Sequence, residues 1–166
     1  MKKIILFSLC LLTFSLQTIW GQKKALAETR KVIERVAGKS DLPISLVLKS
    51  NKGKLDGKTN FKYRVDRGVL NIEGSSPVAL CRGFYDFVKS NRAGLYSWSG
   101  SNIRFPQQLV DGTEKQVVSP FAHHYMFNVC TYGYSMPYWD WERWEKEIDW
   151  MALHGIDMPL ALVGYE

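Results

Sequence analysis

The stretch that decides the fold covers residues 125–166 and reads YMFNVCTYGYSMPYWDWERWEKEIDWMALHGIDMPLALVGYE. It begins with an apolar run at 125–129, continues through a polar and aromatic loop, and ends in a second apolar run at 158–163. Between the two runs lies a tryptophan-rich segment with the periodicity of an amphipathic helix. The order strand, loop, helix, strand is that of one βαβ unit, which favours a parallel sheet or barrel.

The helix of this unit can be predicted in some detail. Asp140 is the expected N-cap, because its carboxylate can accept hydrogen bonds from the N–H groups of the first turn. Glu142 lies near the positive end of the helix dipole, and Gly155 suits the left-handed residue that ends a helix. A single buried stripe is expected from the residues that recur at helical spacing, which are Trp141, Trp144, Ile148, Met151 and Ala152.

The loop before the helix carries the candidate binding residues. Ligands of βαβ units bind at the carboxyl ends of the strands, where Asn128 and Cys130 are predicted to lie. Aromatic residues follow closely, and an aromatic face with an amide suits a sugar, since rings stack and amides bond hydroxyls. The residues alone leave simpler roles open: Asn128 could satisfy a backbone group, Cys130 could be inert core, and the tyrosines could pack within the loop.

The run NVCTYGYSMPYWDWERWEKEIDWMALHGID, residues 128–157, closely resembles the start of the catalytic barrel of α-N-acetylglucosaminidases, a family of retaining glycoside hydrolases. The chain before it is similar, more loosely, to the small N-terminal α/β domain of that family. The resemblance implies an α/β fold. A small N-terminal α+β domain at 22–117 is expected to precede the first βαβ unit of an incomplete (β/α)8 TIM barrel at 118–166.

The resemblance also implies a set of substrate-binding residues. Asn128 matches the sugar-binding asparagine of the family, Cys130 a sugar-contacting cysteine, and Tyr134 a pocket tyrosine. Glu166 matches a glutamate that follows the second strand. Cys130 is expected to be a pocket wall and weak hydrogen-bond partner, with no histidine near it in sequence to activate it. The two catalytic glutamates of the family come from later barrel strands, so none is expected within these residues.

Other reactive residues are assigned no chemistry. The acidic residues of the helix (Glu142, Glu145, Glu147 and Asp149) are expected to face water or neighbouring helices, away from the strand ends. The pair His123–His124 has no partner at metal-ligand spacing, so neither a metal nor a cofactor is expected. Cys81 falls within an apolar helical pattern and is expected to be a buried free thiol.

Residues 1–21 have the features of a signal peptide. Lys2 and Lys3 form a positive start, residues 4–16 are apolar, and Gly21 is a small residue suited to cleavage. The apolar run is too short for a bilayer, which needs about 20 residues. The protein is therefore expected to be exported to the periplasm or secreted, with no membrane attachment after cleavage.

Between the signal peptide and the barrel, the pattern predicts helices packed on a mostly antiparallel sheet. The expected helices cover 24–38 and 77–89, and the expected strands cover 43–48, 61–65, 69–72 and 94–98. A hairpin turn is predicted at 66–68, and residues 102–118 form either a linker or a final strand. The net charge of +6 arises from bases scattered among acids, so nucleic-acid binding is not expected.

The function implied by the resemblance is an exported exo-glycosidase that hydrolyses terminal α-linked N-acetylglucosamine of a glycan with retention. In such a substrate the leaving group is cis to the acetamido group, which cannot attack from the opposite face, so an enzyme carboxylate must be the nucleophile. A barrel needs roughly 250 residues, so this stretch alone is expected to be inactive. The alternatives are a non-catalytic secreted carbohydrate-binding or scaffolding module, and an unrelated exported domain whose aromatic helix docks a partner.

Overall fold

The computed structural model describes residues 2–49 and 57–161, with side chains from residue 20 onward except that of Tyr132. A four-stranded sheet forms its centre, in the order β1 (Ile44–Leu48), β3 (Val69–Gly74), β2 (Asn60–Asp66), β6 (Lys115–Val118). Strand β1 pairs with β3 in parallel, whereas β2 pairs antiparallel with both β3 and β6. The prediction of a mostly antiparallel sheet is confirmed, and the segment after residue 102 does supply a final strand.

The β2–β3 hairpin turns through two residues, as the sequence predicts. Asp66 pairs with Val69, and both intervening residues are left-handed, with φ of 50° at Arg67 and 71° at Gly68. This is the backbone that a two-residue hairpin requires, because its twist matches that of the strands. The tight turn sets the register that places Tyr63, Val65, Leu70 and Ile72 on one buried face.

Two helices cover the apolar face of this sheet. They are the last turns of α1 (Lys2–Ala37) and the whole of α2 (Pro77–Ser90), which contact each other and the strands. Ser76 caps α2 by accepting a hydrogen bond from the N–H of Ala79 at 3.1 Å. At Gly83 an added Cβ would lie only 2.9 Å from Ile72, so glycine permits the close approach of α2 to the sheet. The opposite sheet face is polar and carries Lys62, Arg64, Asn71 and Glu73.

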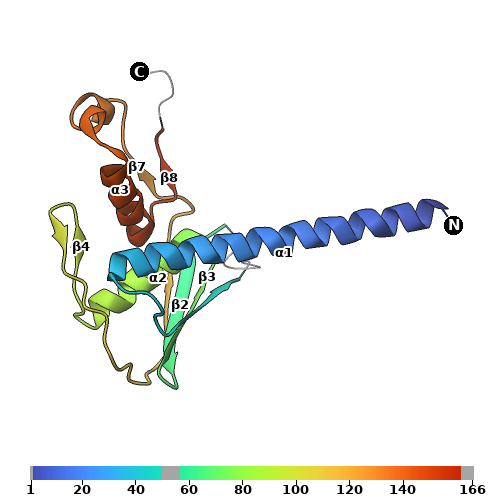
Figure 1. Cartoon of the computed structure of the whole chain (residues 1–166), viewed down its shortest axis with the longest axis horizontal. Coiled ribbons are helices and arrows are strands. Elements are labelled where there is room, and N and C mark those ends of the chain that lie inside the picture. The colour runs from blue at the N-terminus through green and yellow to red at the C-terminus, as the bar shows by residue number, and fades with distance from the viewer. Residues whose placement is uncertain (1, 50–56, 162–166) are drawn as a thin grey trace.

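The N-terminal helix is longer than the sequence predicts. It continues without a break from residue 37 back to Lys2, through the segment predicted to be a signal peptide. Figure 1 shows these first turns extending away from the rest of the molecule. Among the helices of the described residues, none is both long and apolar enough to traverse a lipid bilayer.

The C-terminal part is a parallel βαβ unit, as predicted (Figure 1). It consists of β7 (Tyr125–Met126), α3 (Trp141–His154) and β8 (Met158–Pro159), with Tyr125 opposite Met158. The strand β7 is shorter than the apolar run because Phe127 is left-handed, with φ of 75°. A non-glycine residue in that region turns the chain out of the strand. Asn128 therefore begins a loop and does not end a strand.

Both predicted caps of α3 are confirmed. The side chain of Asp140 accepts from the N–H of Arg143 at 2.8 Å, and Gly155 is left-handed with φ of 81°. The N–H of Ile156 returns to the carbonyl of Met151 at 2.9 Å, which closes the last turn.

The predicted buried stripe of α3 is wrong in part. Met151 is buried, but Trp141 is 70% exposed and Ile148 is 44% exposed. The fully buried residues include Asp149 and Leu153 instead, because α3 packs against α2 and Arg35 of α1 through that face. Periodicity shows that a helix is amphipathic, but the neighbouring elements decide which of its residues they cover.

A small hairpin lies beside α3. It is formed by β4 (Tyr96–Ser97) and β5 (Gly100–Ser101), in the region predicted as a single strand. The backbone of Tyr96 is held by the hydroxyl of Tyr85, which accepts from its N–H at 3.1 Å. At the tip, the ring of Trp98 lies 5.8 Å from that of Trp150 on α3.

Candidate functional site

The loop between β7 and α3 contains three of the four predicted binding residues. It includes two short 3-10 helices, η2 (Thr131–Gly133) and η3 (Met136–Tyr138), which contact each other. Asn128 and Cys130 precede η2, and Tyr134 follows it. The fourth predicted residue, Glu166, lies outside the described residues.

The side chain of Asn128 holds the turn that leads into η2. Its Oδ1 accepts hydrogen bonds from the N–H of Cys130 at 2.9 Å and from the N–H and hydroxyl of Thr131 at 3.2 and 3.1 Å. Backbone N–H groups can only donate, so the atom facing them must be the amide oxygen. The amide nitrogen takes no part in these bonds, and its two N–H groups are the donors that Asn128 can offer to a ligand. The simple structural role left open by the sequence is thus real, and it also orients the amide.

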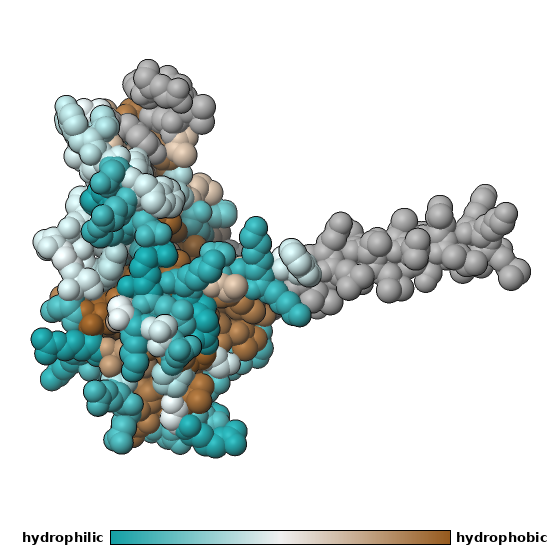
Figure 2. Space-filling model, viewed as in Figure 1, coloured by the Kyte–Doolittle hydropathy of each residue, from teal (hydrophilic) through white to brown (hydrophobic). Residues whose placement is uncertain are grey.

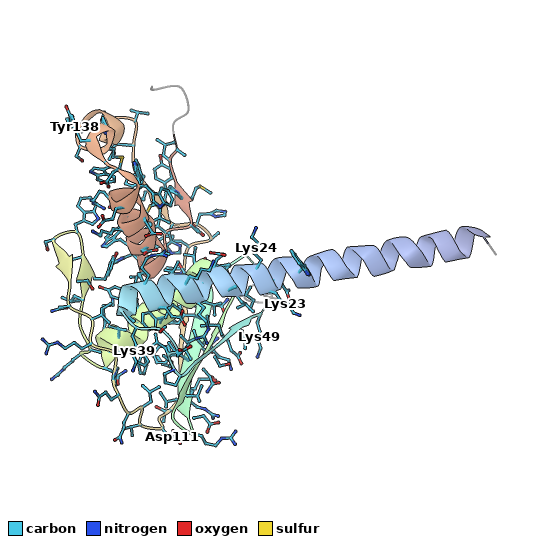
Figure 3. The ribbon with its side chains drawn as sticks, in the orientation of Figure 1. Lys23, Lys24, Lys39, Lys49, Asp111 and Tyr138 are labelled. Carbon is cyan, nitrogen blue, oxygen red and sulfur yellow. The ribbon has the colours of Figure 1, made fainter. Side chains whose placement is uncertain are left out.

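The other two residues are open to solvent. Cys130 is an exposed free thiol at the start of η2, and Tyr134 is 75% exposed. Tyr138, at 87% exposure, stands at the end of the molecule opposite Asp111 (Figure 3). Figure 2 shows that this end is covered by side chains of intermediate hydropathy, as aromatic residues with polar tips should be.

The loop is anchored on its inner side. Met136 is 5% exposed, and the N–H of Trp139 bonds to its carbonyl at 3.0 Å. The ring of Trp139 contacts two side chains of α3. The guanidinium of Arg143 is 4.1 Å from its centroid, and the ring of Trp144 is 5.0 Å away at 72°. The exposed aromatic groups therefore rest on a packed base.

Two of the four helix carboxylates are buried. Asp149 is 1% exposed and receives hydrogen bonds at 2.7 Å from Nε and Nη2 of Arg35. Burial raises the pKa of Asp149, and the bonds from Arg35 offset part of that rise. Glu147 is 0% exposed and bonds to Arg143 at 2.8 Å. Asp149 faces the neighbouring helix α1, which agrees with the expectation that these acids face water or neighbouring helices. The sequence did not predict that Glu147 is completely buried.

Two cavities flank the β4–β5 hairpin, and the sequence did not reveal either of them. One, of about 380 Å³, lies between the hairpin and α3 and is lined in part by Trp98, Arg143 and Trp150. The other, of about 510 Å³, lies between α1 and α3 near Arg35. Asn128, Cys130 and Tyr134 line neither of them. Their positions depend on contacts between distant segments, which local patterns do not encode.

Within the described ranges, no group of three or more His, Cys, Asp or Glu is arranged to hold a metal.

Comparison with known proteins gives the class first. The structure is similar to that of a family 89 glycoside hydrolase from Clostridium perfringens in complex with PUGNAc, with a TM-score of 0.81 and 27% sequence identity. The match covers 91% of the present chain and 17% of the Clostridium chain. A second structure, with two Glu→Gln substitutions, holds the substrate GlcNAc-α-1,4-galactose and matches equally well. A third holds 2-acetamido-1,2-dideoxynojirmycin. The fold of this chain is thus similar to that of part of a glycoside hydrolase.

Sequence comparison gives the family. The model for the N-terminal domain of α-N-acetylglucosaminidase matches residues 27–110, just over half of the chain. The model for the TIM-barrel domain of the same family matches residues 124–166. Human α-N-acetylglucosaminidase is 42% identical over 99 residues, which are 58% of this chain and 13% of the human protein. The chain therefore belongs to the α-N-acetylglucosaminidase family, and it spans less than a fifth of the length of these relatives.

Proposed function

We propose that this chain is the N-terminal part of an exported exo-glycosidase that removes terminal α-linked N-acetylglucosamine from glycans with retention of configuration. One observation carries the proposal: the residues that match the TIM-barrel domain of the family, 124–166, include the parallel β7–α3–β8 unit. In a barrel, such a unit delivers its βα loop to the catalytic face. Here that loop carries Asn128, Cys130 and Tyr134.

The proposal divides the chain by role. Residues 1–21 serve as the signal peptide, 22–117 form a scaffold domain, and 118–166 begin a TIM barrel. The packing of α3 on α2 and Arg35 supports a scaffold role, because it holds the first barrel helix against the sheet domain.

The loop residues are proposed to bind the sugar. Asn128 offers its amide N–H groups to a hydroxyl or acetamido oxygen, while its own oxygen remains on η2. Tyr134 offers an aromatic face, and Cys130 lines the wall between them. Glu166 is proposed as a further polar contact after the second strand. Together they bind the terminal sugar and leave bond cleavage to other groups.

The reaction needs two carboxylates roughly 5–5.5 Å apart, one as nucleophile and one as acid. Asp149 does not suit either role, because it is buried and already bonded to Arg35. Glu147 is likewise buried and bonded to Arg143. The catalytic pair is therefore proposed to come from residues after 166, and the 166-residue chain alone is expected to show no turnover.

Hydrolysis of p-nitrophenyl α-N-acetylglucosaminide by the full-length gene product tests the proposal. Turnover should release α-N-acetylglucosamine first, as seen by NMR, and the β-linked substrate should remain intact. Release of the β-anomer would overturn retention. The carbohydrate-binding alternative is favoured by the exposed aromatic loop, and it predicts saturable glycan binding without hydrolysis.

A further inference from the structure

Glu147 is an unusual residue for the surface helix of a βαβ unit. It is 0% exposed, and its Oε1 has no hydrogen-bond partner among the described residues. Within the part of the chain that the structure describes, its Oε2 bonds only to Arg143, at 2.8 Å. Burying a carboxylate with one partner costs free energy, so hydrophobic residues of similar size are often at least as stable. The presence of a glutamate here points to a role beyond stability.

Arg143 connects Glu147 to the loop. Its guanidinium lies 4.1 Å from the centroid of Trp139, while Nη2 is held by Glu147. A guanidinium stacked on a tryptophan is attracted to the ring face, and fixing the cation fixes the ring. The ring of Trp144 also contacts Trp139, with centroids 5.0 Å apart. Glu147 therefore sets the position of the residue that ends η3.

The position of η3 determines that of the binding loop. Trp139 closes η3 by its bond to Met136, and η3 contacts η2. The turn into η2 is held by the side chain of Asn128, and Tyr134 follows the helix. A continuous set of contacts thus runs from a buried carboxylate to two of the proposed sugar-binding residues.

A second pair on the same helix provides the comparison. Glu142 and Lys146 have the same spacing and the same 2.8 Å separation, but their side chains are 76% and 59% exposed. Exposed pairs of this kind contribute little and hold nothing else. The pair Glu147–Arg143 differs in burial and in its contact with Trp139.

We infer that Glu147 and Arg143 are positioning residues for the sugar-binding loop and that they act through Trp139. This inference rests on the proposed function of that loop. Neither touches the sugar. Their effect is on the placement of Asn128 and Tyr134, so their loss weakens substrate binding more than it slows bond cleavage.

Amide hydrogen exchange of residues 131–139 tests this without any assay of activity. The N–H groups of Gly133 and Trp139 are bonded within the loop and exchange only when it opens. Glu147→Met removes the acceptor and keeps a similar volume, so the loop should exchange about tenfold faster. Glu147→Gln keeps an acceptor for Arg143 and should remain within about twofold of the wild type. Glu142→Met, the matched control, should change nothing.

The same samples distinguish positioning from stability. Exchange in α2, residues 77–90, should be unchanged in Glu147→Met, because the Arg143 side chain that loses its partner is 30% exposed and can be solvated by water. Equal acceleration in α2 and in the loop would mean that Glu147 only stabilises the fold, and would overturn the inference. So would unchanged exchange in the loop.

Kinetics of the full-length protein form the second arm. Glu147→Met should raise KM for p-nitrophenyl α-N-acetylglucosaminide about tenfold and change kcat less than about threefold. If the wild type shows no turnover, the proposed function fails while the exchange result still decides the role of Glu147. If the wild type is active and Glu147→Met matches it in KM and in exchange, the positioning role fails alone.

Discussion

Asn128 shows how one residue serves structure and binding with different atoms. Its amide oxygen holds three donors of η2, so it cannot accept from a sugar as well without breaking the loop. Its amide nitrogen is the part that a ligand can use. The two roles can therefore be separated by substitution, since aspartate keeps the oxygen and lacks the N–H groups.

For Asn128 we predict that Asn128→Asp in the full-length protein lowers kcat/KM about tenfold, the loss of one hydrogen bond of about 1.4 kcal/mol. Asn128→Ala should lower it further, because the turn into η2 also loses the three bonds to the amide oxygen. The measurement is hydrolysis of p-nitrophenyl α-N-acetylglucosaminide. An Asn128→Asp variant with unchanged kcat/KM would remove the amide from the site.

At the scale of elements, Arg35 of α1 pairs with two carboxylates of α3. Arg35 and Asp149 form two hydrogen bonds of 2.7 Å, and Glu145 lies 3.4 Å from the same guanidinium. Asp149 is buried, whereas the side chain of Arg35 is 40% exposed. Removing the arginine leaves a buried carboxylate without its partner, which is the costly way to break such a pair.

We predict that Arg35→Ala lowers the free energy of unfolding by about 2 kcal/mol, less than for a fully buried pair because water reaches Arg35. The double variant Arg35→Ala/Asp149→Asn should recover most of the lost free energy of unfolding, because asparagine leaves no buried charge without a partner. Urea unfolding of the chain measures both. Lys31→Ala, which breaks an exposed pair with Glu28 on the same helix, is the control and should cost less than about 0.5 kcal/mol. A similar small cost for Arg35→Ala would contradict the prediction.

At the scale of the whole molecule, charged and polar groups connect the layers. Asp86 on α2 accepts from the hydroxyl of Tyr63 on β2 at 2.9 Å and from Lys115 on β6 at 2.5 Å. Burial acts to raise the pKa of Asp86, but the hydrogen bonds and charges outweigh it and hold the pKa below its ordinary value. The ion pair thus stabilises the fold at neutral pH and is lost as pH falls through the lowered pKa.

His154 at the end of α3 also links the stability of the fold to pH. Its ring stacks on Trp150 at 4.0 Å and donates from Nδ1 to the carbonyl of Trp150 at 2.8 Å. Burial lowers the pKa of His154 below its ordinary value of 6.5, and the charges of Arg82 and Lys89 add to this. On acidification, the imidazole is therefore protonated in the unfolded chain before it is protonated in the folded protein. The stability that the neutral ring contributes is lost as pH falls from the ordinary pKa of 6.5 to the lowered pKa of the folded state.

We predict that the urea midpoint of the chain falls between pH 8 and pH 5, and that His154→Asn reduces this fall, since asparagine keeps a donor for Trp150 and does not titrate. The raised pKa of Asp149 works in the opposite direction in both proteins, so the difference between them isolates His154. Equal slopes in the two proteins would show that His154 is not responsible.

The local features of this chain could be read from its residues, because each depends on neighbours in sequence. The caps at Asp140 and Gly155, the turn at Arg67–Gly68 and the βαβ order all follow from backbone geometry and short-range hydrogen bonds. The loop that holds Asn128, Cys130 and Tyr134 was located for the same reason. Its proposed chemistry came from the family resemblance, since spacing alone left several roles open.

The tertiary structure decided what depends on segments far apart. It chose the face of α3 that is buried and joined Arg35 to Asp149 across 114 positions. It also enclosed Glu147 beside Arg143, although its pattern is that of an ordinary solvent-facing glutamate. Burial and ion pairing depend on which surfaces come into contact after folding. A periodic pattern shows only that a helix has an apolar face, and not which element packs against it.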